Sequence, residues 1–100
     1  MARKIIWSLE ASIDVEGIFE FLLKTSPPYA KRFVIKVQDS AKSLKTFPDR
    51  GRHVPEYPEL NAREIFVDSF RLIYRVFPDY IEITSVIHMA RDITKLGIFE

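Results

Sequence analysis

The stretch REIFVDSFRLIYRVFPDYIEITSVIHM, residues 63–89, decides the fold, because apolar side chains alternate along it and turn residues interrupt it twice. This pattern predicts three β-strands, at Arg63–Val67, Phe70–Phe77 and Tyr80–Met89. Only Asp68-Ser69 separates the first two strands, and Pro78-Asp79 turns the chain into the third. Connections of two residues are typical of β-hairpins, so we expect three mainly antiparallel strands in chain order.

The middle strand carries two cations on one side. Because successive side chains of a strand point to opposite faces, Arg71 and Arg75 share one face, while Leu72, Tyr74 and Val76 share the other. Tyr74 is expected in the core, with its hydroxyl bound to a nearby acceptor. The two arginines have two interpretations: they bind a partner, or they pair with Glu64 or Glu82 across the sheet.

The residues before this stretch predict one strand and two helices. Arg3–Trp7 reads as a short edge strand that ends at Ser8, a residue suited to cap a helix. Residues 9–24 have an apolar stripe at helical spacing, and Gly17 within it suggests a close approach to a neighbouring helix. After Pro27-Pro28, a second helix is expected over Tyr29–Thr46, antiparallel to the first.

The resulting element order, β-α-α-β-β-β, predicts an α+β fold, in which a helical hairpin packs on one face of a mainly antiparallel sheet. The opposite face is expected to be at least partly open. Residues 49–61 read as a loop, and residues 90–100 as a short added strand or a mobile end. Residues 1–100 are the length of one domain.

Composition excludes several classes of function. The 15 Lys and Arg nearly balance the 14 Asp and Glu, so any contact with nucleic acid needs a local basic patch. There is no cysteine, and His53 and His88 lie far apart in the sequence, so we expect no metal site held by thiolates or histidines. No apolar run approaches the ~20 residues that a membrane span needs. A cytoplasmic protein without membrane contact is expected.

Three motifs in order, PDRGRHVPE (48–56), REIFVDSFRLIYRV (63–76) and ITSVIHMARD (83–92), resemble the ParE/RelE superfamily of bacterial type II toxins. The RGRHVPE and RLIYRVFPDYIEITSVIHMAR segments are more similar to the ParE-like, plasmid-stabilisation branch. This resemblance implies a toxin that inhibits DNA gyrase and needs no cofactor. It also implies a cognate antitoxin that binds and neutralises the toxin, in a possible hetero-oligomer.

The resemblance leaves two alternatives. One is a RelE-like, metal-independent endoribonuclease that cuts messenger RNA on the ribosome, and the other is a non-toxic relative that only binds an antitoxin. In the nuclease, Arg63, Arg71 and Arg75 would bind phosphate and His88 would transfer protons. The nuclease set is incomplete, because Ile65 stands where a second lysine is expected and the tail has no tyrosine, although Phe99 could stack on a base.

The residues expected to bind a partner or target are all arginines. In the loop, Arg50 and Arg52 flank Gly51 and concentrate positive charge, although Asp49 and Glu56 could pair with them instead. His88, if it is not catalytic, is expected to be a hydrogen-bonded structural residue. The full set of candidate partner-binding residues is Arg50, Arg52, Arg63, Arg71, Arg75 and Arg91.

Overall fold

The computed structural model describes residues 3–99 and confirms the α+β fold, with one added strand. The elements in chain order are β1 (Lys4–Trp7), α1 (Leu9–Leu23), α2 (Pro27–Ser43), β2 (Arg52–His53), β3 (Ala62–Val67), β4 (Phe70–Val76), β5 (Tyr80–His88) and a short 3-10 helix, η1 (Ile93–Lys95). The added strand, β2, lies within the segment that the sequence predicts as loop. Two residues are too few to show a period in the sequence.

The five strands form one sheet in the order β1-β5-β4-β3-β2. Three neighbouring pairs are antiparallel, while β1 runs parallel to β5 at the edge of the sheet. A β-bulge interrupts the β4–β5 register, because Ile73 pairs with Ser85 but Tyr74 pairs with Ile83. Asp14 of α1 accepts hydrogen bonds from the Ser85 hydroxyl and from the Val86 amide next to this bulge.

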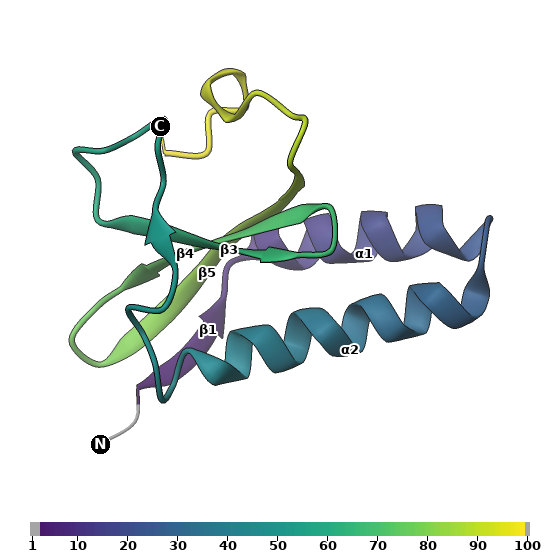
Figure 1. Cartoon of the computed structure of the whole chain (residues 1–100), viewed down its shortest axis with the longest axis horizontal. Helices are drawn as coiled ribbons and strands as arrows, with labels where there is room; N and C mark the ends of the chain where they lie inside the picture. The colour runs from purple at the N-terminus through teal and green to yellow at the C-terminus, as the bar shows by residue number, and fades with distance from the viewer. Residues whose placement is uncertain (1–2, 100) are drawn as a thin grey trace.

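Two serines define where the helices begin. The Ser8 side chain accepts a hydrogen bond from the Ala11 amide, and the Ser26 side chain accepts one from the Tyr29 amide. The second helix therefore starts at Pro27, where proline is favoured, rather than at Tyr29. The two helices run side by side, and the end of their hairpin extends past the sheet (Figure 1). Within residues 3–99, no helix has the length and apolar character needed to cross a membrane.

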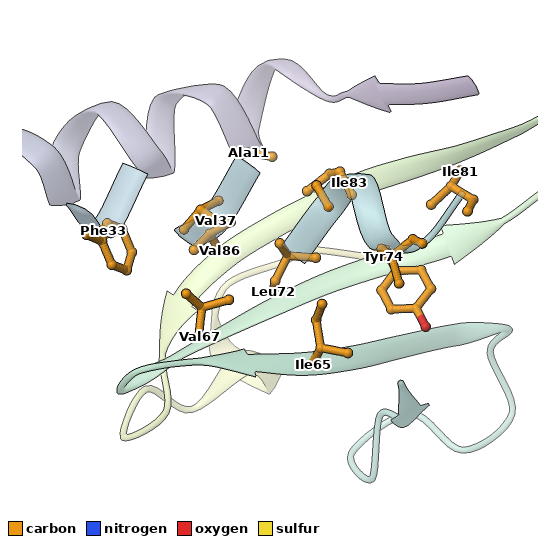
Figure 2. Packing of buried hydrophobic residues seen from close by; sticks show 12 residues of the cluster. Ala11, Phe33, Val37, Ile65, Val67, Leu72, Tyr74, Ile81, Ile83 and Val86 are labelled. Atoms are coloured by element: carbon orange, nitrogen blue, oxygen red, sulfur yellow. The ribbon is translucent and has the colours of Figure 1, made fainter. Parts of the chain in front are cut away.

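The main core lies between the helical hairpin and the sheet. Phe33 and Val37 of α2 and Ala11 of α1 pack against the apolar side chains of β3, β4 and β5 (Figure 2). Tyr74 is fully buried in this cluster, and its hydroxyl donates to the carbonyl of Pro48 at 2.8 Å. Both expectations for Tyr74 are thus confirmed.

Gly17 does not have the packing role expected of it. An added Cβ at Gly17 would meet no heavy atom within 4 Å, so α2 makes no close approach at this residue.

The opposite face of the sheet is partly covered and partly open, as expected, because Phe66 and Ile6 on that face are 46% and 45% exposed. The segment before β3 and the C-terminal tail lie on the side of the sheet away from the helices (Figure 1). They enclose a second buried cluster of Val54, Ala62, Ile73, Ile87 and Ile93. Residues 90–99 of the tail therefore form no strand but pack on the sheet, and Glu100 lies outside the described residues. Ile93 of the tail is fully buried, because apolar tail residues find a surface on β4 and β5.

Candidate partner-binding surface

Arg71 lies in a buried ion-pair cluster on the partly covered face of the sheet. Its Nε and Nη2 atoms donate to the two carboxylate oxygens of Glu64 at 3.0 and 2.6 Å, and its Nη1 and Nη2 atoms donate to Glu56 at 2.8 Å each. The side chain of Arg71 is 5% exposed and that of Glu64 is 0% exposed. Four charge-assisted hydrogen bonds leave one of its five N–H groups unused, so Arg71 presents little to a partner.

Glu56 ties the loop before β3 to this cluster. The Arg71 guanidinium donates two hydrogen bonds to the Glu56 carboxylate and holds its pKa below the usual range. A carboxyl group whose pKa is lower in the folded than in the unfolded chain stabilises the fold at pH values above its unfolded-state pKa, which is ~4.3 for Glu. This stabilisation is lost as the pH falls through the pKa of the folded state. The loop should therefore become less firmly held in acid.

We expect the unfolding free energy of the wild type to decline as pH falls below about 4.5, and a Glu56→Gln variant to show a shallower decline. Urea unfolding at a series of pH values between neutrality and pH ~3 measures both slopes. Glu59→Gln is the matched control, because Glu59 is an exposed carboxylate of the same loop without an ion pair within residues 3–99. Equal slopes for Glu56→Gln and the wild type would contradict the linkage.

The basic loop after α2 is held by backbone contacts. The Gly51 amide donates to the Tyr74 hydroxyl at 2.9 Å, and Arg63 donates to the Gly51 carbonyl at 2.7 Å. Burial raises the pKa of the Tyr74 hydroxyl, which keeps it protonated as the donor to Pro48. These contacts fix the backbone between two exposed arginines, Arg50 and Arg52.

Arg52 is an accessible part of this surface. Its side chain is 60% exposed, with a guanidinium nitrogen 3.5 Å from Glu64 and its Cζ 5.1 Å from the ring centre of Phe66. Phe66 is itself 46% exposed, so a cation and an aromatic ring are presented together. Arg50 differs, since its guanidinium donates to the Ser43 hydroxyl at the end of α2. The expected pairing of Asp49 and Glu56 with the loop arginines is replaced by Asp49–Arg63 and Glu56–Arg71.

Arg75 lies near the C-terminal tail. Its Cζ is 5.6 Å from the ring centre of Phe77 and 5.9 Å from that of Phe99, and it pairs with Glu82 at 3.4 Å. Phe99 also contacts Tyr57 edge to face, with 4.9 Å between ring centres. In this structure Phe99 therefore belongs to the cover of the sheet.

His88 and Arg91 lie at the other end of β5. Both are exposed. The His88 Nδ1 atom accepts a hydrogen bond from the Ala90 amide at 3.1 Å, and its ring contacts Phe70 edge to face. Arg91 follows the strand, and its amide donates to the His88 carbonyl.

The four nuclease candidates do not converge. Arg63 pairs with Tyr74 and so faces the helices, whereas Arg71 and Arg75 face the tail. His88 pairs with Phe70, four residues along β4 from Tyr74, which corresponds to about 13 Å of strand. Arg52 and Arg71 share the Oε2 atom of Glu64, at 3.5 and 3.0 Å, whereas Arg63 bonds to the Gly51 carbonyl. The sequence analysis did not include Phe66 in this surface. The signal was its position in β3 opposite Arg71, which places both side chains on the same face of the sheet.

Comparisons with known proteins identify the family. The family model described as "ParE toxin of type II toxin-antitoxin system, parDE" matches residues 5–93. A relative from Caulobacter vibrioides, "Toxin RelE2", is 27% identical over 89 residues, which are 88% of this chain and 97% of that protein. The solved structure "Chromosomal ParDE TA system from P. aeruginosa" has the same fold, with a TM-score of 0.72 and 19% identity over 87% of this chain and 96% of that one. Since the family model covers both long helices and all five strands except Lys4, the first residue of β1, the chain belongs to the ParE toxin family of type II toxin–antitoxin systems.

Proposed function

We propose that this toxin inhibits DNA gyrase in the bacterial cytoplasm and that a cognate antitoxin neutralises it. The observation that carries the proposal is the family match over residues 5–93. The placement of the basic residues supports gyrase over messenger RNA, because metal-free cleavage needs phosphate-binding and proton-transfer groups around one phosphate. Here Arg63, Arg71 and His88 lie in three places, and Arg71 is occupied by two carboxylates.

The purified chain is expected to trap gyrase on DNA. Gyrase, ATP and closed circular plasmid are incubated with the chain, and linear DNA is measured after detergent and protease treatment. A parallel reaction contains ribosomes programmed with a messenger RNA. Linear plasmid with intact message supports the proposal. Cuts in the message with unaffected gyrase would instead support the ribonuclease alternative. The name of the relative, "Toxin RelE2", favours that alternative.

The exposed loop arginines are the residues we expect to contact the target. An Arg50→Ala/Arg52→Ala variant should weaken inhibition by about tenfold or more, because a hydrogen bond to a charged group contributes ~1.5–3 kcal/mol and 1.4 kcal/mol is a factor of ten. The concentration giving half-maximal inhibition of supercoiling measures this change.

Lys4→Ala/Lys24→Ala is the matched control, since it removes the same charge from exposed positions away from the loop. If both double variants lose inhibition equally, net charge rather than the loop determines target binding.

Co-expression with the protein encoded beside this gene tests the second half of the proposal, neutralisation by an antitoxin. Growth should recover with that protein and should stop without it. Growth unaffected by the chain alone would indicate a non-toxic family member.

A further inference from the structure

The outer face of the helical hairpin has an apolar groove that no other element within residues 3–99 covers. This groove has a volume of about 540 Å³ and is lined by Ser12, Val15, Glu16, Phe19, Lys31, Val34 and Ile35. Ile35 is 56% exposed, although an isoleucine is usually buried. The helices are seen side by side in Figure 1, away from the tail and the loop that cover the sheet.

The two helices that form the groove carry opposite charges. Helix α1 contains four acidic residues and no basic one, Glu10, Asp14, Glu16 and Glu20. Helix α2 contains four basic residues and one acidic one, Lys31, Arg32, Lys36, Lys42 and Asp39. Within residues 3–99 no ion pair of 4 Å or less joins α1 to α2. Asp14 is bonded to β5 and Lys36 to Asp68, but Glu16 and Lys31, which line the groove, have no ion pair within residues 3–99 and are available to an outside partner.

We propose that this face binds a second copy of the chain through a two-fold interface, in which α1 of each copy faces α2 of the other. A two-fold axis parallel to the helices places α1 over the partner's α2 at the same level of the hairpin. Glu16 and Lys31 line the same groove, so each would then meet its opposite charge across the interface. An axis perpendicular to the helices would set α1 on α1 and bring like charges together.

The area of this face indicates how tightly the dimer can be expected to bind. Helix α2 has 17 residues, which span about 25 Å at ~1.5 Å per residue, and two adjacent helices are roughly 20 Å wide. The face therefore offers about 500 Å² per copy, or about 1,000 Å² in total. This is the lower limit for a specific interface, so the dimer should be weak and should depend on concentration.

Sedimentation equilibrium of the purified chain over a concentration series tests the proposal. The wild type should approach twice the monomer mass, and Ile35→Glu should raise the dimer dissociation constant at least tenfold by placing a charge in the groove. Ile13→Glu is the control, because Ile13 is also 56% exposed but lies on the other side of α1 and does not line the groove. A wild type that stays monomeric, or a dimer that Ile13→Glu weakens and Ile35→Glu does not, would overturn the proposal.

Charge reversal tests the orientation. Glu16→Lys alone should raise the dissociation constant several-fold, and adding Lys31→Glu should restore it, because the opposite charges are then exchanged across the interface. No restoration would overturn the two-fold arrangement. If the wild type stays monomeric and Ile35→Glu instead abolishes neutralisation by the antitoxin, the face belongs to the antitoxin. Neither result depends on gyrase, so failure here and failure of the proposed target are distinguishable.

Discussion

Replacing Arg71 by alanine is expected to lower the free energy of unfolding by about 3–5 kcal/mol, because the change leaves the buried Glu64 carboxylate with only the 3.5 Å contact to the exposed Arg52. Glu64 is fully buried and receives two hydrogen bonds from Arg71, at 3.0 and 2.6 Å. A domain of this size has ~5–15 kcal/mol of stability in total, so the loss would unfold an appreciable fraction of the chain. Urea unfolding of the purified variant measures it.

Two further variants distinguish a broken ion pair from a lost surface charge. Arg75→Ala should cost ~0–1 kcal/mol, since Arg75 has a 39% exposed side chain and, within residues 3–99, a single ion pair at 3.4 Å. Arg71→Met combined with Glu64→Leu should regain most of the stability lost in Arg71→Ala, because both buried charges are removed. If Arg71→Ala proved as stable as Arg75→Ala, the cluster would not be holding the sheet.

This expected loss of stability affects how activity data on Arg71 variants should be interpreted. An arginine in the middle strand of a toxin invites the reading that it binds phosphate, and a loss of toxicity in its alanine variant would seem to support that reading. Here the same loss follows from unfolding alone, because the guanidinium already donates four hydrogen bonds within the chain. Activity of Arg71 variants is informative only beside a measurement of their stability.

The sequence predicted which face each arginine of β4 occupies, because strand alternation is a local property and survives the bulge, which lies on β5. It also offered pairing with Glu64 and Glu82 as one interpretation, and those pairs are present. It could not predict Glu56 as the second partner of Arg71. Glu56 lies 15 residues away in a segment without a period, and only the folded loop brings it near.

The face of the sheet away from the helices shows the same limit of prediction from the sequence. Val54 and Ile93 belong to segments that the sequence described as loop and tail, yet both are fully buried against Ile73. Their burial depends on where the chain travels after each element ends, and periodicity does not contain that information. The candidate surface changed accordingly. Once Arg71 was enclosed, the candidate arginines that remained exposed were those of the loop between α2 and β3 and the one that follows β5.

The loop around Gly51 provides the second large effect, because it holds the exposed arginines in place and has no room for a side chain. A Cβ added at Gly51 would lie 2.7 Å from the carbonyl oxygen of Glu64 and 2.7 Å from the Tyr74 hydroxyl. Tyr74 cannot move aside without losing its bonds to Pro48 and to the Gly51 amide. Gly51→Ala should therefore cost about 3 kcal/mol, from overpacking and a lost buried hydrogen bond.

Gly17→Ala is the matched control for this substitution. It adds the same methyl group where no heavy atom lies within 4 Å, inside helix α1, and should stabilise the fold by ~0.5–1 kcal/mol. Urea unfolding of the two variants should thus give shifts of opposite sign. Gly51→Ala should also impair gyrase inhibition as much as Arg50→Ala/Arg52→Ala does, since it moves the backbone that positions both arginines. A Gly51→Ala protein that keeps wild-type stability and inhibition would contradict this link between the buried glycine and the exposed surface.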